Sequence, residues 1–182
     1  IKTYLHHSGD SYSLPSNHIN HLAEDSLGNF WIATSKGLAL YDVEQDRFTT
    51  VNSCIIYSSV EVEGGIWFGS ENAIYCYDYK SKQLKTIHIE KEESKDSNLV
   101  DYRIQKMLYL EEGKILIGTR KKGIYLYDCR IRQFTLLIPH GRNLLTSLYV
   151  TTDRRIYTAF YGDGFYCYDR TGKMLEHYTK EN

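Results

Sequence analysis

Six side chains whose chemistry suits ligand binding stand in short polar segments of the chain. They are four cations, one tyrosine and one carboxylate: Lys36, Arg120, Lys121, Arg142, Tyr161 and Asp163. An aromatic ring can stack on the apolar face of a sugar, and charged groups can exchange hydrogen bonds with its hydroxyls. The cations would also suit an acidic sugar. The set would therefore suit a sugar ligand, although for each single Lys or Arg an ordinary solvated side chain is the stronger interpretation.

Other residues that could do chemistry have the wrong spacing. His18 and His21 are three positions apart, so on a strand their side chains point to opposite faces and cannot bind one metal ion. Adjacent carboxylates such as Glu24 and Asp25 diverge in the same way. The four cysteines lack CxxC spacing, and no phosphate-binding glycine motif occurs. We therefore expect no metal, no cofactor and no catalytic residue.

The charge balance excludes two classes of partner. The chain has 22 basic and 23 acidic residues, a net charge of −1. That balance supplies no attraction to nucleic acid or to an anionic membrane. No apolar run approaches the roughly 20 residues that span a bilayer. We expect no nucleic-acid binding, and membrane attachment only through a segment outside these residues.

A four-fold internal repeat dominates the sequence. Residues 37–42, 73–78, 123–128 and 164–169 have the sequences GLALYD, AIYCYD, GIYLYD and GFYCYD, each ending in Tyr-Asp. A second apolar segment precedes each copy, at residues 30–34, 66–70, 115–119 and 156–160, with Ala or Gly always in its fourth position. Internal repeats of this kind indicate an architecture built from one repeated unit.

The repeat length indicates a propeller. The closing aspartates at 42, 78, 128 and 169 are 36, 50 and 41 residues apart, close to the roughly 40–50 residues of a four-stranded blade. A charged insertion at 90–97 explains the long interval. The central strands are apolar on both faces, as in a sheet between two other sheets. We predict an all-β protein, a β-propeller of four four-stranded antiparallel blades forming an arc of a larger, seven-bladed propeller.

The blade boundaries follow from the repeat. Blades are predicted at residues 16–52, 53–97, 98–141 and 142–182, and residues 1–15 as the outer strand and loop of a preceding blade. That outer strand is placed at residues 3–6. Within the first blade, strands A to D are predicted at 17–24, 30–34, 38–41 and 47–51.

Blade geometry places the six candidate residues together. With strand A innermost, the B–C and D–A loops share one face of a propeller, and the A–B and C–D loops share the other. All six candidates fall in B–C or D–A loops, where binding residues commonly gather on a rigid scaffold. The tryptophans and repeated tyrosines fall in strands and are interpreted as packing residues. Cys76 and Cys167 occupy one repeated core position and are expected to be free thiols.

Residues 13–42, SLPSNHINHLAEDSLGNFWIATSKGLALYD, closely resemble the two-component regulator propeller repeat, S-L-x-x-N-x-I-x-x-I-x-E-D-x-x-G-x-L-W-I-G-T-x-x-G-L-x-x-Y-D. The second and fourth copies depart from it by losing Glu-Asp and the usual turn. The resemblance implies the periplasmic ectodomain of an inner-membrane protein, a hybrid two-component sensor of a glycan-degrading bacterium. In that family the blades are followed by a β-sandwich, a membrane helix, a histidine kinase, a receiver and a DNA-binding domain.

The function implied by this resemblance is ligand sensing without catalysis. The domain would recognise an oligosaccharide and relay the signal to the kinase, in a sensor that forms a homodimer. A propeller-fold polysaccharide lyase or glycosidase is the alternative, and it would need converging carboxylates or a His/Tyr pair. A protein-interaction scaffold is the third hypothesis, although the blades lack the Trp-Asp ending and Gly-His opening of WD-type repeats.

Overall fold

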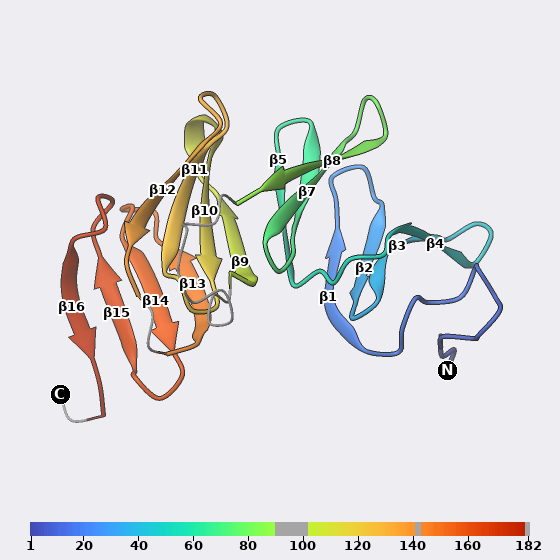
Figure 1. Cartoon of the computed structure of the whole chain (residues 1–182), viewed down its shortest axis with the longest axis horizontal. Helices are drawn as coiled ribbons and strands as arrows, with labels where there is room; N and C mark the ends of the chain where they lie inside the picture. The colour runs from blue at the N-terminus through green and yellow to red at the C-terminus, as the bar shows by residue number, and fades with distance from the viewer. Residues whose placement is uncertain (90–101, 141–142, 181–182) are drawn as a thin grey trace, which may run out of the picture. The chain divides into compact units, whose positions relative to one another are not determined.

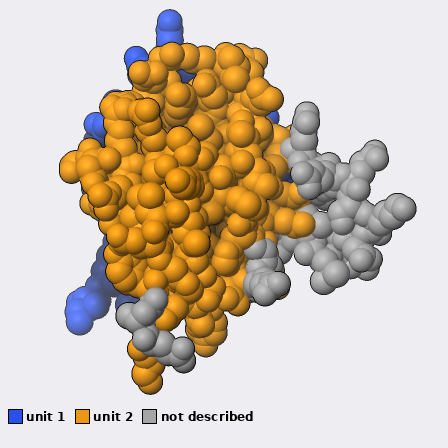
Figure 2. Space-filling model, turned by 90° about the vertical axis from the view of Figure 1, so that its left-hand side faces the viewer, with its two compact units in different colours: residues 1–86 blue, residues 87–182 orange. Residues whose placement is uncertain are grey.

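The computed structural model describes residues 1–89, 102–140 and 143–180. The chain divides into two compact units, residues 1–86 and residues 87–182 (Figures 1 and 2). Apart from one 3-10 turn, η1 (Glu111–Gly113), the regular structure of the described residues is β-strand. No helix in the described part has the length and apolar character needed to cross a membrane.

Unit 1 contains two four-stranded sheets in which strands follow their chain order. The first holds β1 (Ile19–Glu24), β2 (Phe30–Thr34), β3 (Gly37–Asp42) and β4 (Arg47–Asn52). The second holds β5 (Ser58–Val62), β6 (Gly65–Gly69), β7 (Ala73–Asp78) and β8 (Gln83–His88). The last two residues of β8 are counted with unit 2.

Unit 2 repeats the same arrangement. Its first sheet holds β9 (Ile104–Tyr109), β10 (Lys114–Thr119), β11 (Ile124–Asp128) and β12 (Gln133–Ile138). Its second holds β13 (Leu145–Val150), β14 (Ile156–Phe160), β15 (Phe165–Tyr168) and β16 (Met174–Tyr178). Four antiparallel four-stranded sheets without a closed barrel confirm the predicted propeller-blade fold. The number of blades in a complete ring stays a prediction, and the insertion at 90–97 lies outside the described residues.

The strand predicted at residues 3–6 does not form. The structure assigns no strand before Ile19, because a strand exists only where its backbone groups pair with a neighbour, and no described strand pairs with this segment. Tyr4 is instead held by side-chain contacts. Its ring packs edge-on against Phe48, with 5.2 Å between centroids, and its hydroxyl donates a 2.6 Å hydrogen bond to Asp46.

The aspartate that ends each repeat has a structural role. Asp42 accepts a hydrogen bond from the backbone N–H of Gln45 at 3.0 Å. Asp128 and Asp169 accept equivalent bonds from the residue two positions later, each at 2.8 Å. Aspartate favours such turns because its short side chain satisfies the backbone locally. The Tyr-Asp signature therefore marks the turn from the third strand to the fourth.

The core of unit 1 forms around Trp31, which is 1% exposed. Its ring lies 5.1 Å from that of Phe68 and 4.9 Å from that of Tyr77, both in the second sheet. Its indole N–H donates a 2.9 Å hydrogen bond to Asp25. The packing role predicted for Trp31 is confirmed. All four cysteines are free, and Cys76 and Cys167 are buried as predicted.

Candidate ligand-binding site

A buried threonine fixes each of two turns that carry predicted site residues. In the β2–β3 turn, the Thr34 hydroxyl donates to the Gly37 carbonyl at 2.9 Å and accepts the Lys36 backbone N–H at 3.1 Å. In the β10–β11 turn, Thr119 makes the same pair of bonds with Gly123 and Lys122, at 2.8 and 2.9 Å. The turns are therefore ordered by internal hydrogen bonds between the threonine hydroxyl and the turn backbone.

Glycine closes the β10–β11 turn for a steric reason. Gly123 has a φ of 89°, a backbone conformation that L side chains rarely adopt. A Cβ at this position would also stand 2.2 Å from the Ile138 carbonyl oxygen of β12. Only glycine fits both conditions, which explains why this residue type recurs at the start of the third strand.

Two turns of unit 2 are attached to neighbouring residues at the start of β13. The backbone N–H of Leu145 donates to the Arg120 carbonyl at 3.2 Å, and that of Tyr161 donates to the Leu144 carbonyl at 2.9 Å. The β10–β11 and β14–β15 turns come from different sheets, so these bonds bring predicted residues of both sheets to one place. The Tyr161 side chain there is 75% exposed.

The structure thus groups four of the six predicted residues: Arg120, Lys121, Tyr161 and Asp163. We call these four the loop cluster. Lys36 is exposed but belongs to unit 1, and Arg142 lies outside the described residues.

Asp163 is bound to two aromatic residues of the neighbouring strands. Its carboxylate accepts a 2.9 Å hydrogen bond from the Tyr166 hydroxyl, and its backbone carbonyl lies 2.9 Å from His177 Nε2. The Tyr166 and His177 rings stack 3.9 Å apart as cross-strand neighbours in β15 and β16. The Tyr166 hydrogen bond is the main cause of a lowered pKa at Asp163, supported by Asn143. Asp163 therefore carries a fixed negative charge at neutral pH.

His140 is a further aromatic residue near this carboxylate. Its ring stacks on Phe160, with centroids 3.6 Å apart, and its Nε2 atom is buried without a hydrogen-bond partner. Burial lowers the pKa of the imidazole, and the charge of Asp163 partly opposes that shift. His140 is therefore neutral at physiological pH.

Sequence reasoning missed His140, Tyr166 and His177. Tyr166 stands three residues after Asp163, but the repeat assigns it to a strand and so to the core. The two histidines are 37 positions apart in the sequence, from 140 to 177. Only the pairing of β15 with β16 shows that His177 reaches Tyr166.

The arrangement suits orientation of a polar, ring-shaped ligand. It offers an exposed ring at Tyr161, a carboxylate acceptor at Asp163 and cationic donors at Arg120 and Lys121. Within the described ranges, no group of three or more His, Cys, Asp or Glu side chains could hold a metal ion.

Lowering the pH from about 7 to about 5 should destabilise unit 2 through His140. Because burial lowers the folded-state pKa below the ordinary 6.5, the unfolded chain takes up a proton first. The stabilising contribution is complete above that ordinary value and is lost as the pH falls through the lower, folded-state pKa. We expect this pH change to lower the midpoint of urea unfolding less in His140→Phe than in wild type. NMR resonances of β15 and β16 monitor the unfolding of unit 2. Equal falls in both proteins would contradict this assignment.

Comparison with known proteins supports the same architecture. Residues 13–36 match the family model described as two component regulator propeller. No curated protein matches the chain at a significant level.

Solved structures extend the match over nearly the whole chain. The extracellular domain of BT3049 from B. thetaiotaomicron, described as a hybrid two component system, superimposes with a TM-score of 0.72 at 19% identity over 96% of this chain. That of BT4673, described likewise, gives 0.70 at 21% identity over 97%. PorZ, a surface component of the type-IX secretion system of Porphyromonas gingivalis, gives 0.65 at 14% identity over 90%.

The chain spans about a quarter of each of these proteins, namely 23%, 26% and 27% of their lengths. At such identities the likeness establishes the fold. The chain carries a two-component regulator propeller repeat at residues 13–36 and has the propeller-blade fold of these bacterial extracellular domains.

Proposed function

We propose that this chain is part of the periplasmic ligand-sensing domain of a hybrid two-component sensor anchored in the inner membrane. Its ligand is an oligosaccharide, and its output is a histidine kinase elsewhere in a homodimeric protein. The repeat match supports the sensor role, and the solved extracellular domains supply the matching fold.

The observation that carries the ligand class is the loop cluster of unit 2. The exposed ring of Tyr161 stands on a turn fixed to Leu144, and the turn of Arg120 and Lys121 is fixed to the adjacent Leu145. An exposed aromatic ring on the same turn as a carboxylate, next to a turn that carries two cations, would suit the stacking and hydrogen-bonding needs of a sugar ring. The cations favour a sugar that carries a carboxylate or sulfate.

Signalling would operate by population shift. A ligand biases an equilibrium between two packings of the ectodomain only as far as its affinities for the two packings differ. In this scheme the sugar stabilises one arrangement of the homodimer, and the membrane helix transmits that preference to the kinase.

Isothermal titration calorimetry of the chain against neutral and acidic oligosaccharides tests this proposal. We expect saturable binding of at least one acidic member, weakened about ten-fold or more by Tyr161→Ala, since a fully used stacking contact contributes on the order of 1–2 kcal/mol. Tyr149→Ala is the matched control, because Tyr149 is also exposed, at 63%, but lies on β13 rather than in the loop cluster. Absence of binding across the panel, or equal weakening by both variants, would overturn the proposal.

A further inference from the structure

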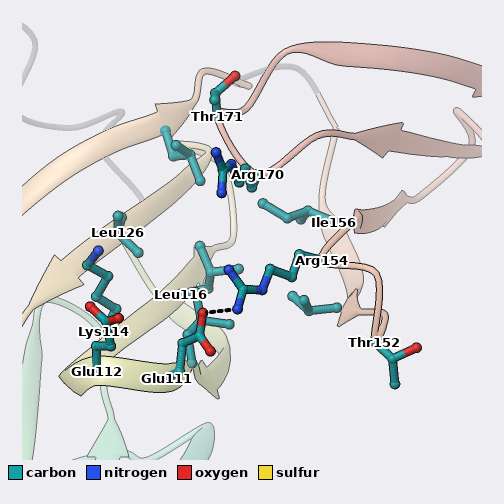
Figure 3. Close-up of a pocket in the computed structure, with 13 residues that line it drawn as sticks. Glu111, Glu112, Lys114, Leu116, Leu126, Thr152, Arg154, Ile156, Arg170 and Thr171 are labelled. Carbon is teal, nitrogen blue, oxygen red and sulfur yellow. Dashed lines mark ion pairs between the residues drawn. The ribbon is translucent and has the colours of Figure 1, made fainter.

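A cavity of about 600 Å³ lies in unit 2 between its two sheets (Figure 3). It opens where η1, the β13–β14 turn and the β15–β16 turn meet. Six aliphatic side chains line it: Leu110, Leu116, Leu126, Leu137, Val150 and Ile156. Its volume falls within the roughly 300–1,000 Å³ of small-molecule sites, which are likewise mostly apolar.

The corresponding place in unit 1 is filled by an indole ring. Trp31 of β2 pairs with Ala23 and Leu40 on the neighbouring strands. Leu116 of β10 pairs in the same way with Leu108 and Leu126. Leu116 therefore occupies in unit 2 the position that Trp31 occupies in unit 1, with a much smaller side chain.

The hydrogen-bond acceptor of that indole is replaced as well. Asp25 accepts the Trp31 indole N–H at 2.9 Å. Its backbone N–H donates to the carbonyl of Asn29, four residues later, and the Leu110 N–H donates to that of Lys114 in the same pattern. Leu110 is thus the counterpart of Asp25, and the Asp–Trp pair of unit 1 is a Leu–Leu pair in unit 2.

The second sheet of each unit, which faces this position, also differs between the units. In unit 1, the Tyr79 hydroxyl donates a 2.6 Å hydrogen bond to Glu61, the partner of Ile66 in the β5–β6 pair. The partner of the equivalent Ile156 is Val150, and the residue after the closing aspartate is Arg170 instead of tyrosine. Unit 1 thus has two aromatic rings and two carboxylates at the positions where unit 2 has three aliphatic side chains and one cation.

The rim of the cavity carries three cations, Lys114, Arg154 and Arg170, against two carboxylates, Glu111 and Glu112. Lys114 and Arg170 both line it, and neither forms an ion pair with another described residue. A third cation, Arg154, is paired with Glu111 at 2.5 Å, and in Figure 3 this pair lies in front of Leu116. Two cations are consequently available to an anionic group at the edge of an apolar space.

We propose that this cavity binds a small aromatic carboxylate. The ring takes the space that Trp31 fills in unit 1, against Leu116 and Ile156, and the carboxylate pairs with Arg170 and Lys114. This site is separate from the loop cluster, which is carried by the β10–β11 and β14–β15 turns, so it does not depend on the oligosaccharide proposal.

Calorimetry of the chain with indole-3-acetate tests this site, with indole-3-acetamide as the neutral analogue. We expect one saturable site for the acetate with a Kd below about 1 mM, and at least about five-fold weaker binding of the amide. Leu116→Trp should fill the cavity and weaken binding about ten-fold or more. Leu136→Trp introduces the same ring at a position of β12 that is 44% exposed and should bind as wild type does.

A second variant covers the case in which Leu116→Trp fails to fold. Arg170→Gln changes an exposed side chain. We expect it to reduce the affinity for the acetate towards that of the amide, with Lys114 as the remaining cation and with an unchanged circular dichroism spectrum. The proposal is overturned by the absence of a saturable site below about 1 mM, by equal affinities for acetate and amide, or by undiminished binding in Arg170→Gln or folded Leu116→Trp. None of these outcomes bears on oligosaccharide binding at the loop cluster.

Discussion

Replacing Trp31 with alanine is expected to lower the free energy of unfolding of unit 1 by about 4 kcal/mol, in the range for large-to-small changes at fully buried aromatic sites. The side chain is 1% exposed and contacts the rings of Phe68 and Tyr77 in the adjoining sheet. Its removal leaves a cavity between the two sheets and an Asp25 carboxylate without its indole donor.

Urea unfolding monitored by the remaining tryptophan, Trp67 of β6, measures this loss, because both tryptophans of the chain lie in unit 1. Leu27→Ala is the control. Leu27 is 63% exposed in the β1–β2 turn, and its loss should change stability by no more than about 0.5 kcal/mol. A loss at Trp31 no larger than at Leu27 would show that the ring does not hold the two sheets together.

Replacing Asp25 with alanine is expected to cost about 3 kcal/mol, because one buried carboxylate serves several donors. It accepts hydrogen bonds from the backbone N–H groups of Leu27 and Asn29, from the Asn29 amide and from the Trp31 indole, at 2.9 to 3.1 Å. Without it, the indole N–H is buried and unsatisfied, and the β1–β2 turn loses its internal acceptor.

A double-mutant cycle separates these two contributions. In the Trp31→Phe background, Asp25→Ala should cost less than in wild type, since the indole donor is already absent. The coupling energy, taken from urea unfolding of all four proteins, is expected to be about 1 kcal/mol or more. Additive effects would place the role of Asp25 in the turn alone.

The sheets were predictable because the repeat carries the signals for turns as well as strands. The closing aspartates cap turns. Gly37, Gly123 and Gly164 each stand where a Cβ would collide with a backbone carbonyl oxygen, and only the second copy has alanine there, so local chemistry and spacing agree. The strand predicted at residues 3–6 failed for the complementary reason. The residue pattern of this segment is typical of a strand, but a strand forms only when a neighbouring strand pairs with it, and the residue pattern does not indicate whether one is present.

Only part of the candidate site could be predicted from the sequence. Loop position identified Arg120 and Tyr161, but their attachment to Leu144 and Leu145 depends on backbone bonds that residue types do not encode. The repeat does not predict the cavity, because its walls come from two sheets. Leu116 in a tryptophan position is visible in the repeat, but the space that it leaves depends also on Val150, Ile156 and Arg170 opposite.

The attachment of two turns to the dipeptide Leu144–Leu145 has a mechanical consequence. A displacement of the Arg120 turn acts directly on the backbone that restrains the Tyr161 turn, since the two hydrogen bonds are made by consecutive residues. Contact with either turn should therefore alter the motion of the other. A displacement of one sheet's turn thus reaches the turn of the next sheet through backbone hydrogen bonds alone.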